Sequence, residues 1–266
     1  MRVKKHLGQN FLRDPKILKK IVDFAEIKKT DTVLEIGPGE GTLTKILLER
    51  AGRVIAVEKD HELAEKLKER WKDLKKERKL EILEGDILKF PTSITKGHPW
   101  PESTWPKVTL GNYKLIGNIP YYITGEIFRK FLESEHQPQS ITFVVQKEVA
   151  ERIMARDKKE SILSISIKAF GTPEYGGVIK AGSFVPAPKV DSAIIAIRNI
   201  SMEKFKEVKI EKFFEILKKG FAHKRKLLKS NLSVEDADLH QCGIPVKARA
   251  EDLNIDDWIC LSKRLI

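Results

Sequence analysis

Apolar residues gather in short runs along the first 150 residues, separated by stretches with helical spacing. The clearest unit lies in residues 31–60, where an apolar run at 33–36 ends in a glycine-rich turn that leads into apolar residues at helical spacing. A second apolar run, at 54–57, ends at Glu58. This pattern predicts a βαβ unit with an acid at the tip of its second strand.

The remaining pattern extends this unit in both directions. Asp14 and Pro15 predict the start of a helix ahead of the first strand, and residues 61–79 mix Glu and Lys like an exposed helix. Further strands are expected at 80–83, 113–117 and 141–145, with a helix starting at Thr124 or Gly125. From residue 161 to 200 the pattern changes: residues 162–170 alternate loosely, and 177–184 and 192–198 flank a proline-rich turn. An α/β sheet closed at its edge by a hairpin is therefore expected.

Composition narrows the class of protein. The chain has 266 residues, 41% hydrophobic and 33% charged, which is long enough for one large domain or a large and a small one. It contains no apolar run long enough to span a bilayer, and its basic start lacks the apolar stretch of a secretory signal. These features predict a cytoplasmic protein.

The charge balance points to a polyanionic partner. Lys and Arg number 50 against 38 Asp and Glu, which gives a net charge of +12. The first thirteen residues contain no acid, and neither does the basic segment 218–229. Concentrated basic patches favour nucleic-acid binding over a merely solvated surface. The basic residues of that second segment are Lys218, Lys219, Lys224, Arg225, Lys226 and Lys229.

Cysteine and histidine usage gives no sign of a metal centre. Cys242 and Cys260 are the only cysteines, and their spacing matches neither a zinc site nor a redox motif. Both are expected to be reduced and structural. The six histidines lack a paired-ligand spacing, so no metal is expected.

The glycine turn and two acids predict a nucleoside-binding rim. Gly37, Gly39 and Gly41 allow a ligand to approach the backbone, and Glu58 can accept hydrogen bonds from ribose hydroxyls. Asp86 follows the third strand and should lie on the same rim, although a turn or helix cap is its simpler role. Nicotinamide, flavin and S-adenosylmethionine folds all use such a turn, so the cofactor depends on a second motif.

Asn118, Ile119, Pro120 and Tyr121 supply that motif at the end of the next strand. An asparagine oxygen and the carbonyl before proline can accept both hydrogens of an adenine amine, which frees the nitrogen lone pair for alkylation. The neighbouring aromatic ring can stack on a base that has left its helix. The alternative is a structural turn that ends the strand.

A dense proline segment at 91–107 contains Trp100 and Trp105. So many prolines exclude regular structure there. The tryptophans can either stack on bases or cover a hydrophobic edge.

Six motifs stand in the order in which they occur in ribosomal RNA adenine dimethyltransferases, and the chain resembles the KsgA type of that family over nearly its whole length. The motifs are Gly8-Gln9-Asn10-Phe11-Leu12, Glu35-Ile36-Gly37-Pro38-Gly39-Glu40-Gly41, Gly85-Asp86, Asn118-Ile119-Pro120-Tyr121-Tyr122-Ile123, Gln146-Lys147-Glu148-Val149-Ala150-Glu151-Arg152 and Phe184-Val185-Pro186-Ala187-Pro188-Lys189-Val190-Asp191-Ser192. The resemblance implies a Rossmann-like seven-stranded S-adenosylmethionine-dependent methyltransferase domain at 1–200 and a small α-helical RNA-binding domain at 201–266. It also implies dimethylation of two adjacent adenines in a hairpin near the 3′ end of small-subunit (16S) rRNA, in ribosome biogenesis, by a monomer acting on rRNA or on a pre-assembled small subunit.

The resemblance also implies roles for single residues. The cofactor site would comprise Asn10, Leu12, Gly37, Glu58, Asp86 and Asn118, and the catalytic residues would be Asn118, Pro120 and Tyr121. Phe184 is a candidate second wall for the target base, with core packing as the equal alternative. RNA would bind Phe184 and the basic residues Lys224, Arg225, Lys226 and Lys229. The segment 221–228, which carries the first three of these basic residues, is expected to be helical.

Two other functions share many of these features. Enzymes that methylate a large-subunit (23S) rRNA adenine and confer macrolide resistance have the same cofactor motifs, but the basic segment and the C-terminal match argue against them. An RNA-binding or transcription factor that had lost catalysis would have no need to keep Asn118 together with both acids. Family members often carry Arg where Lys224 stands, which puts bidentate phosphate binding there in doubt.

Overall fold

The computed structural model describes residues 10–76, 79–91 and 110–265. The N-terminus before residue 10 and the tryptophan-bearing part of segment 91–107 lie outside the described residues. The chain forms two compact units, Met1–Ala150 with Glu174–Arg198, and Glu151–Pro173 with Asn199–Ile266. Segment 151–173 thus groups with the C-terminal part, which the predicted division at residue 200 did not include. The Glu160 N–H donates to the Glu251 carbonyl at 2.8 Å within that unit.

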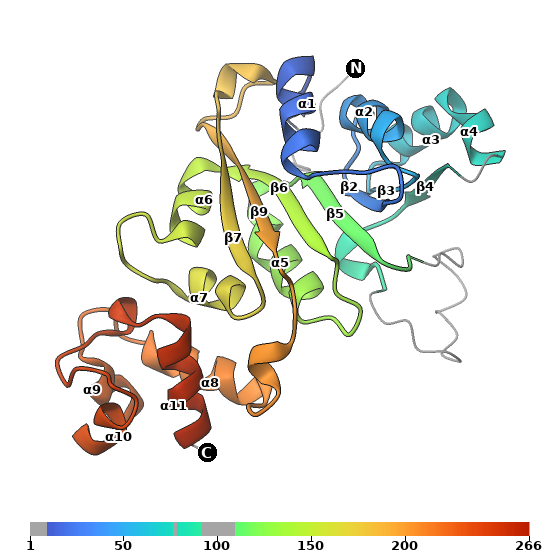
Figure 1. The fold of residues 1–266 in the computed structure, drawn as a ribbon. Coiled ribbons are helices and arrows are strands. Elements are labelled where there is room, and N and C mark those ends of the chain that lie inside the picture. Colours follow the sequence, from blue (N-terminus) through green and yellow to red (C-terminus); the bar gives the residue numbers. More distant parts are fainter. Residues whose placement is uncertain (1–9, 77–78, 92–109, 266) are drawn as a thin grey trace. The chain divides into compact units, whose positions relative to one another are not determined.

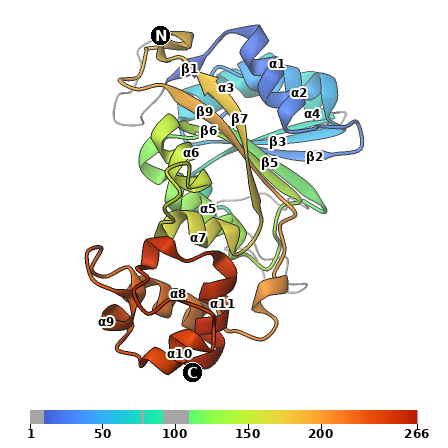
Figure 2. The same cartoon turned by 60° about the vertical axis from the view of Figure 1, so that its left-hand side comes forward.

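The first unit is built on an open, mostly parallel sheet (Figure 1). Within the described residues it has seven strands in the order β4-β3-β2-β5-β6-β9-β7, with β9 antiparallel to β6 and the first five strands parallel. Helices α1 to α3 cover one face and α5 the other (Figure 2). The predicted Rossmann-like α/β fold is confirmed. The strands are β2 (Thr32–Ile36), β3 (Arg53–Glu58), β4 (Leu80–Glu84), β5 (Tyr113–Asn118), β6 (Ser140–Gln146), β7 (Thr172–Ile179) and β9 (Ser192–Arg198).

A side-chain cap explains where α1 begins. Asp14 accepts a hydrogen bond from the Lys16 N–H at 2.9 Å, so α1 starts as predicted. The expected single helix 61–79 is instead two helices, because the backbone leaves helical geometry at Trp71. The helices up to residue 154 are α1 (Pro15–Phe24), α2 (Thr42–Arg50), α3 (His61–Arg70), α4 (Lys72–Lys76), α5 (Thr124–Leu132) and α6 (Lys147–Met154).

The region from residue 161 to 200 differs from the expectation in two ways. Residues 162–168 form helix α7 (Ile162–Lys168), because Ser161 and Ser164 cap it reciprocally and this local signal outweighs the loose alternation. The two strands of the expected edge hairpin, β7 and β9, are neighbours in the sheet. They are not joined by a simple turn, because η4 (Ala181–Ser183) and a further short strand lie between them. Phe184 lies in a separate strand, β8 (Phe184–Val185), paired antiparallel with β1 (Phe11–Leu12).

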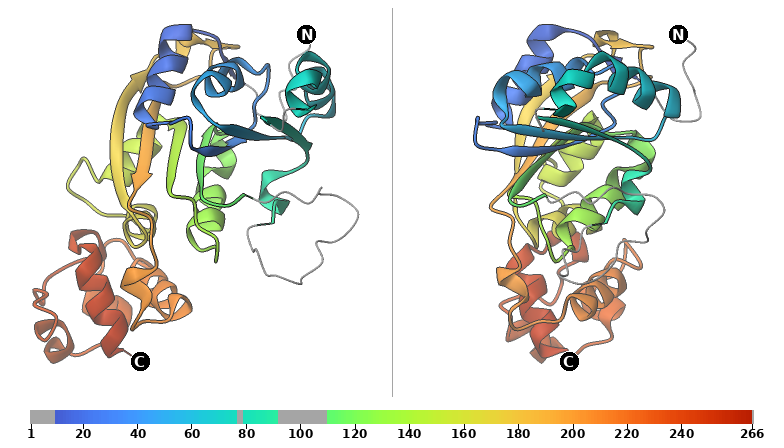
Figure 3. Two further views of the ribbon diagram at one scale, coloured as in Figure 1. Left: turned by 45° about the vertical axis from the view of Figure 1, so that its right-hand side comes forward. Right: turned by 90° about the vertical axis from the view of Figure 1, so that its right-hand side faces the viewer.

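The second unit is helical, with its helices packed side by side (Figure 3). Trp258 is fully buried, and a Cβ on Gly220 would come within 2.3 Å of its ring, so only glycine allows this close approach. Besides α7, its helices are α8 (Ile210–Gly220), α9 (Leu228–Leu232), α10 (Asp236–His240) and α11 (Ile255–Arg264).

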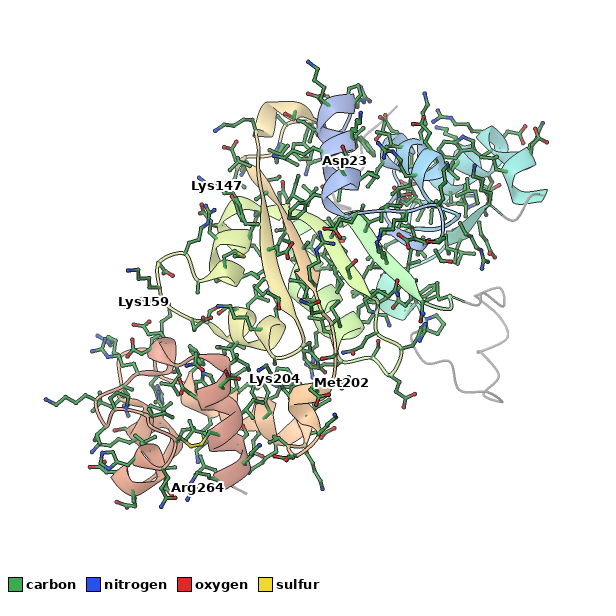
Figure 4. All side chains as sticks on the ribbon, viewed as in Figure 1. Asp23, Lys147, Lys159, Met202, Lys204 and Arg264 are labelled. Carbon is green, nitrogen blue, oxygen red and sulfur yellow. A yellow bond between two sulfur atoms is a disulfide. The ribbon has the colours of Figure 1, made fainter. Side chains whose placement is uncertain are left out.

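Cys242 and Cys260 form a disulfide, drawn in yellow in Figure 4. The expectation that both are reduced was wrong. Their spacing of 18 residues matches no motif, but packing of α10 on α11 brings their Cα atoms to 5.8 Å, within the usual range for a disulfide. The bond closes a loop within the helical unit and so restricts the unfolded chain.

Candidate active site

The carboxyl ends of four neighbouring parallel strands, β4, β3, β2 and β5, meet at one pocket of the first unit. Open α/β sheets bind ligands at this edge. All eight predicted cofactor and catalytic residues line the pocket: Asn10, Leu12, Gly37, Glu58, Asp86, Asn118, Pro120 and Tyr121. Residues from segments more than 100 positions apart are thus gathered as the sequence predicted.

The glycine turn and Glu58 hold each other in place. Gly37, Gly39 and Gly41 all have positive φ, and a Cβ on Gly39 would meet the Phe11 ring at 2.9 Å. The Gly39 N–H donates to Glu58 Oε2 at 2.9 Å, and the Asp60 N–H donates to Oε1 at 2.8 Å. Burial raises the pKa of Glu58, which these two hydrogen bonds counteract. The carboxylate therefore has a fixed direction and keeps lone pairs for a ligand.

Asp86 is fixed by a cap and an ion pair. Its Oδ1 accepts the Leu88 N–H at 3.0 Å at the start of a short 3₁₀ helix, η2 (Ile87–Lys89), and its Oδ2 accepts Lys59 Nζ at 2.8 Å. Partial burial acts to raise the pKa of Asp86, but the bonds from Lys59 and Leu88 lower it below its ordinary value. Asp86 is thus both the turn cap and a charged acceptor in the pocket wall, so the two roles considered for it are compatible.

Asn118 ends β5 with its amide oriented by the N-terminal segment. Its Nδ2 donates to the Asn10 carbonyl at 2.8 Å, so Oδ1 points away from that bond. The Thr42 hydroxyl makes a second tie, to the Leu12 carbonyl at 2.9 Å. The pairing of β1 with β8 alone would hold this segment only weakly. These two hydrogen bonds therefore help to hold residues 10–12 against the rim.

Two tyrosines follow Pro120 in the 3₁₀ turn η3 (Tyr121–Ile123), and their side chains differ in how firmly they are held. The Tyr121 hydroxyl bonds Ser192 Oγ at 2.8 Å, and burial raises the pKa of Tyr121. Its ring is therefore held in one orientation. Tyr122 also lines the pocket but is 62% exposed.

Comparison with known proteins identifies the family. The family model for ribosomal RNA adenine dimethylases matches residues 1–266. The chain belongs to the ribosomal RNA adenine dimethylase family. It is therefore an rRNA adenine dimethyltransferase, and its substrate is rRNA.

The similarity to individual relatives and to solved structures extends over nearly the full length of the chain. The dimethylase is 39% identical to a ribosomal RNA small subunit methyltransferase A of Dehalococcoides mccartyi, over 98% of this chain and 88% of the relative. It is 35% identical to the protein of the same name from Clostridium botulinum, over 97% and 92%. Similar solved structures, both 27% identical, are a dimethyladenosine transferase from Plasmodium falciparum (TM-score 0.76, 94% and 95% covered) and the 23S rRNA methyltransferase ErmE (TM-score 0.70, 96% and 99%).

Glu35 is a pocket residue of the dimethylase to which the sequence motifs gave no role. It is 1% exposed within β2, and neither carboxyl oxygen has a hydrogen-bond partner among the described residues. Burial, aided by the nearby Glu58 charge, raises the pKa of Glu35 to about 8. An acid inside an otherwise apolar strand was the available signal.

Phe184 does not line the pocket. It is 3% exposed and belongs to the hydrophobic cluster that also contains Leu12 and Leu18. A side chain so enclosed has no free face for a base. The core-packing alternative therefore describes its position, and no RNA contact is assigned to it.

The basic segment 221–228 of the dimethylase is not the predicted helix. Helix α8 ends at Gly220 and α9 begins at Leu228, and the residues between form turns. Asn231 is buried and donates from Nδ2 to the carbonyls of Gly220 and His223, which holds the chain in this bent path. Residues 222–226 are all exposed, whereas Lys229 pairs with Asp236 at 2.9 Å.

Two further observations bear on other functions. In the described ranges, His61, Glu65 and Glu84 lie close enough to share a cation, but all three are exposed and Lys68 already contacts Glu65 at 2.7 Å, so no metal is assigned. No helix of the described ranges combines the length and apolarity required to cross a bilayer.

Proposed function

We propose that the enzyme uses S-adenosylmethionine to dimethylate the exocyclic amines of two adjacent adenines in a hairpin near the 3′ end of small-subunit rRNA. The observation that carries this proposal is the convergence of Glu58, Asp86 and Asn118 on one pocket. The small-subunit target rests on the names of the full-length relatives. The enzyme acts as a monomer in ribosome biogenesis, on rRNA or a pre-assembled small subunit, and therefore in the cytoplasm.

The pocket residues fit a cofactor made of methionine and adenosine. Glu58 accepts from the ribose hydroxyls, since its carboxylate is already held by two backbone N–H groups. Asp86 accepts from the adenine amine, and Asn10 and Leu12 close over the methionine end above Gly37. The bound cofactor supplies an electrophilic methyl group on a sulfonium.

The residues after β5 prepare the target amine. Asn118 Oδ1 and the Ile119 carbonyl accept its two hydrogens, which makes the nitrogen more tetrahedral and frees its lone pair. The Tyr121 ring, fixed through Ser192, stacks on the flipped base. After methylation the positively charged nitrogen releases a proton to solvent, so no strong general base is needed.

The target subunit can be tested in cells. Mass spectrometry of rRNA from a strain that lacks this gene should show loss of dimethyladenosine from small-subunit rRNA, and the parental gene should restore it. Loss of methyladenosine from large-subunit rRNA instead would assign the enzyme to the macrolide-resistance class.

Replacing Glu58 with Ala should weaken S-adenosylmethionine binding by roughly 1.5 to 3 kcal/mol, the scale of hydrogen bonds to a charged acceptor. Calorimetry of the folded variant measures this. Glu84→Ala is the control, because Glu84 also ends a strand at this rim but does not line the pocket. Unchanged affinity in the Glu58 variant would remove the ribose assignment, and tight NADH binding would indicate a dehydrogenase-type site.

The exposed basic segment 222–226 is the proposed RNA surface of the helical unit. Replacing Lys224, Arg225 and Lys226 with Ala should lower RNA affinity, because fewer phosphates are neutralised. The salt dependence of binding should flatten by roughly one unit of slope for each phosphate that the variant no longer neutralises. The cofactor affinity should stay the same.

Replacing Lys66, Lys68 and Lys72 with Ala controls for net charge. This variant also loses three positive charges, but from the helices α3 and α4, which carry acids as well. Filter binding across a salt series compares both variants. If the two triple variants lose RNA affinity equally, only net charge matters, and the segment is not a specific surface.

A further inference from the structure

Lys59 is a charged pocket residue to which the proposed chemistry gives no role. It directly follows Glu58 at the end of β3 and lines the same pocket as Asp86. The Gly85 N–H donates to the Glu58 carbonyl at 2.8 Å, which sets the tips of β3 and β4 side by side. This register places the lysine and the aspartate within reach of each other.

The lysine occupies one oxygen of Asp86 and the backbone occupies the other. Nζ lies 2.8 Å from Oδ2, and the Leu88 N–H lies 3.0 Å from Oδ1. Because each carboxylate oxygen has two acceptor positions, both oxygens stay able to accept one more hydrogen bond. The ion pair thus fixes the carboxylate without consuming its acceptor capacity.

We propose that Lys59 is a positioning residue for the adenine of the cofactor, holding the Asp86 carboxylate ionised and aimed at the adenine amine. An ionised carboxylate only accepts, so it selects a ring edge that carries an amine donor. A protonated or rotated carboxyl group would lose that selectivity. The inference rests on the proposed function, since it assumes that Asp86 contacts the adenine.

Other charged groups surround Asp86, and the test must separate them. Lys89 lies on η2, half-buried Lys130 comes from α5, and Glu58 and Glu84 end the adjoining strands. Lys59 is the lysine in direct ion-pair contact with Asp86, whereas Lys89 and Lys130 act on the carboxylate through longer-range electrostatics. Lys89 is exposed and does not line the pocket, which makes Lys89→Met a matched control.

Lys59→Met keeps an unbranched side chain only one atom shorter and removes the charge. Calorimetry with S-adenosylmethionine at pH 7.5 should show a three- to tenfold loss of affinity, while Lys89→Met stays within twofold. The loss in Lys59→Met should grow as the pH falls from 7.5 to 4.5, because Asp86 without its partner takes up a proton at higher pH. A purely structural ion pair at the surface would leave the pH profile of binding unchanged.

A double-mutant cycle with Asp86→Asn completes the test. Lys59→Met should have no further effect in the Asp86→Asn protein, because the lysine acts through the carboxylate. Equal losses in both backgrounds, an unchanged pH profile or tighter binding would overturn the role of Lys59. Asp86→Asn with parental affinity would instead overturn the adenine contact in the proposed function, which distinguishes the two failures.

Discussion

Asn118→Ala should slow methyl transfer about a hundredfold or more in single-turnover reactions with saturating cofactor and RNA. In the proposed mechanism the Asn118 oxygen accepts most strongly when the target nitrogen becomes tetrahedral, so the interaction belongs to the transition state and should affect the rate more than the affinity. Some loss of cofactor affinity is expected because Asn118 lines the pocket proposed to bind the cofactor. RNA affinity should remain within a few-fold of the parent.

Thr42→Val provides the control for this experiment. Asn118 has a second function, because its Nδ2 ties down the Asn10 carbonyl, and the Thr42 hydroxyl makes the neighbouring tie to Leu12. If the rate loss came only from a loosened segment 10–12, Thr42→Val would reproduce it. A parental rate in Asn118→Ala would show instead that the motif is a structural turn and that the catalytic assignment is wrong.

The placement of the site residues at the carboxyl edge of the sheet was predictable because it follows from short sequence patterns. Parallel strands separated by helices must end on one edge, so Glu58, Asp86 and Asn118 could be assigned to one site from their positions after apolar runs. Asp14 likewise predicted the start of α1, because its capping hydrogen bond involves a residue only two positions away. Periodicity and capping suffice where the deciding contacts are close in sequence.

The predictions failed where distant contacts decide. Segment 221–228 has helix-favouring residues, but Asn231 binds the carbonyl of His223 and holds the chain in a turn. The disulfide depends on the packing of α10 against α11, which no spacing rule gives. The Lys59–Asp86 pair depends on the register of β3 against β4 and was equally hidden in the sequence.

Glu35 provides a pH test of the pocket in the cofactor-free enzyme. Its ordinary pKa of 4.5 rises to about 8 on folding, chiefly because burial disfavours the charged form of the carboxyl group. Between these values the folded state holds a proton that the unfolded state releases, so the free energy of unfolding should fall as the pH rises. The stability linked to this proton is complete below pH 4.5 and is lost as the pH rises through about 8.

Glu35→Gln removes this titration and should flatten the pH dependence by up to about 1.4 kcal/mol per pH unit in that range. Relative to their difference at pH 4.5, the variant should gain on the order of 4 kcal/mol over the parent by pH 8. Urea denaturation at a series of pH values measures the curves, and Glu135→Gln, an exposed acid, is the control. The buried Glu58 is present in all three proteins, so its own titration contributes to all three curves. Parallel curves for parent and Glu35→Gln would mean that Glu35 is ionised and paired in solution, and that the pocket is more polar than the packing around β2 indicates.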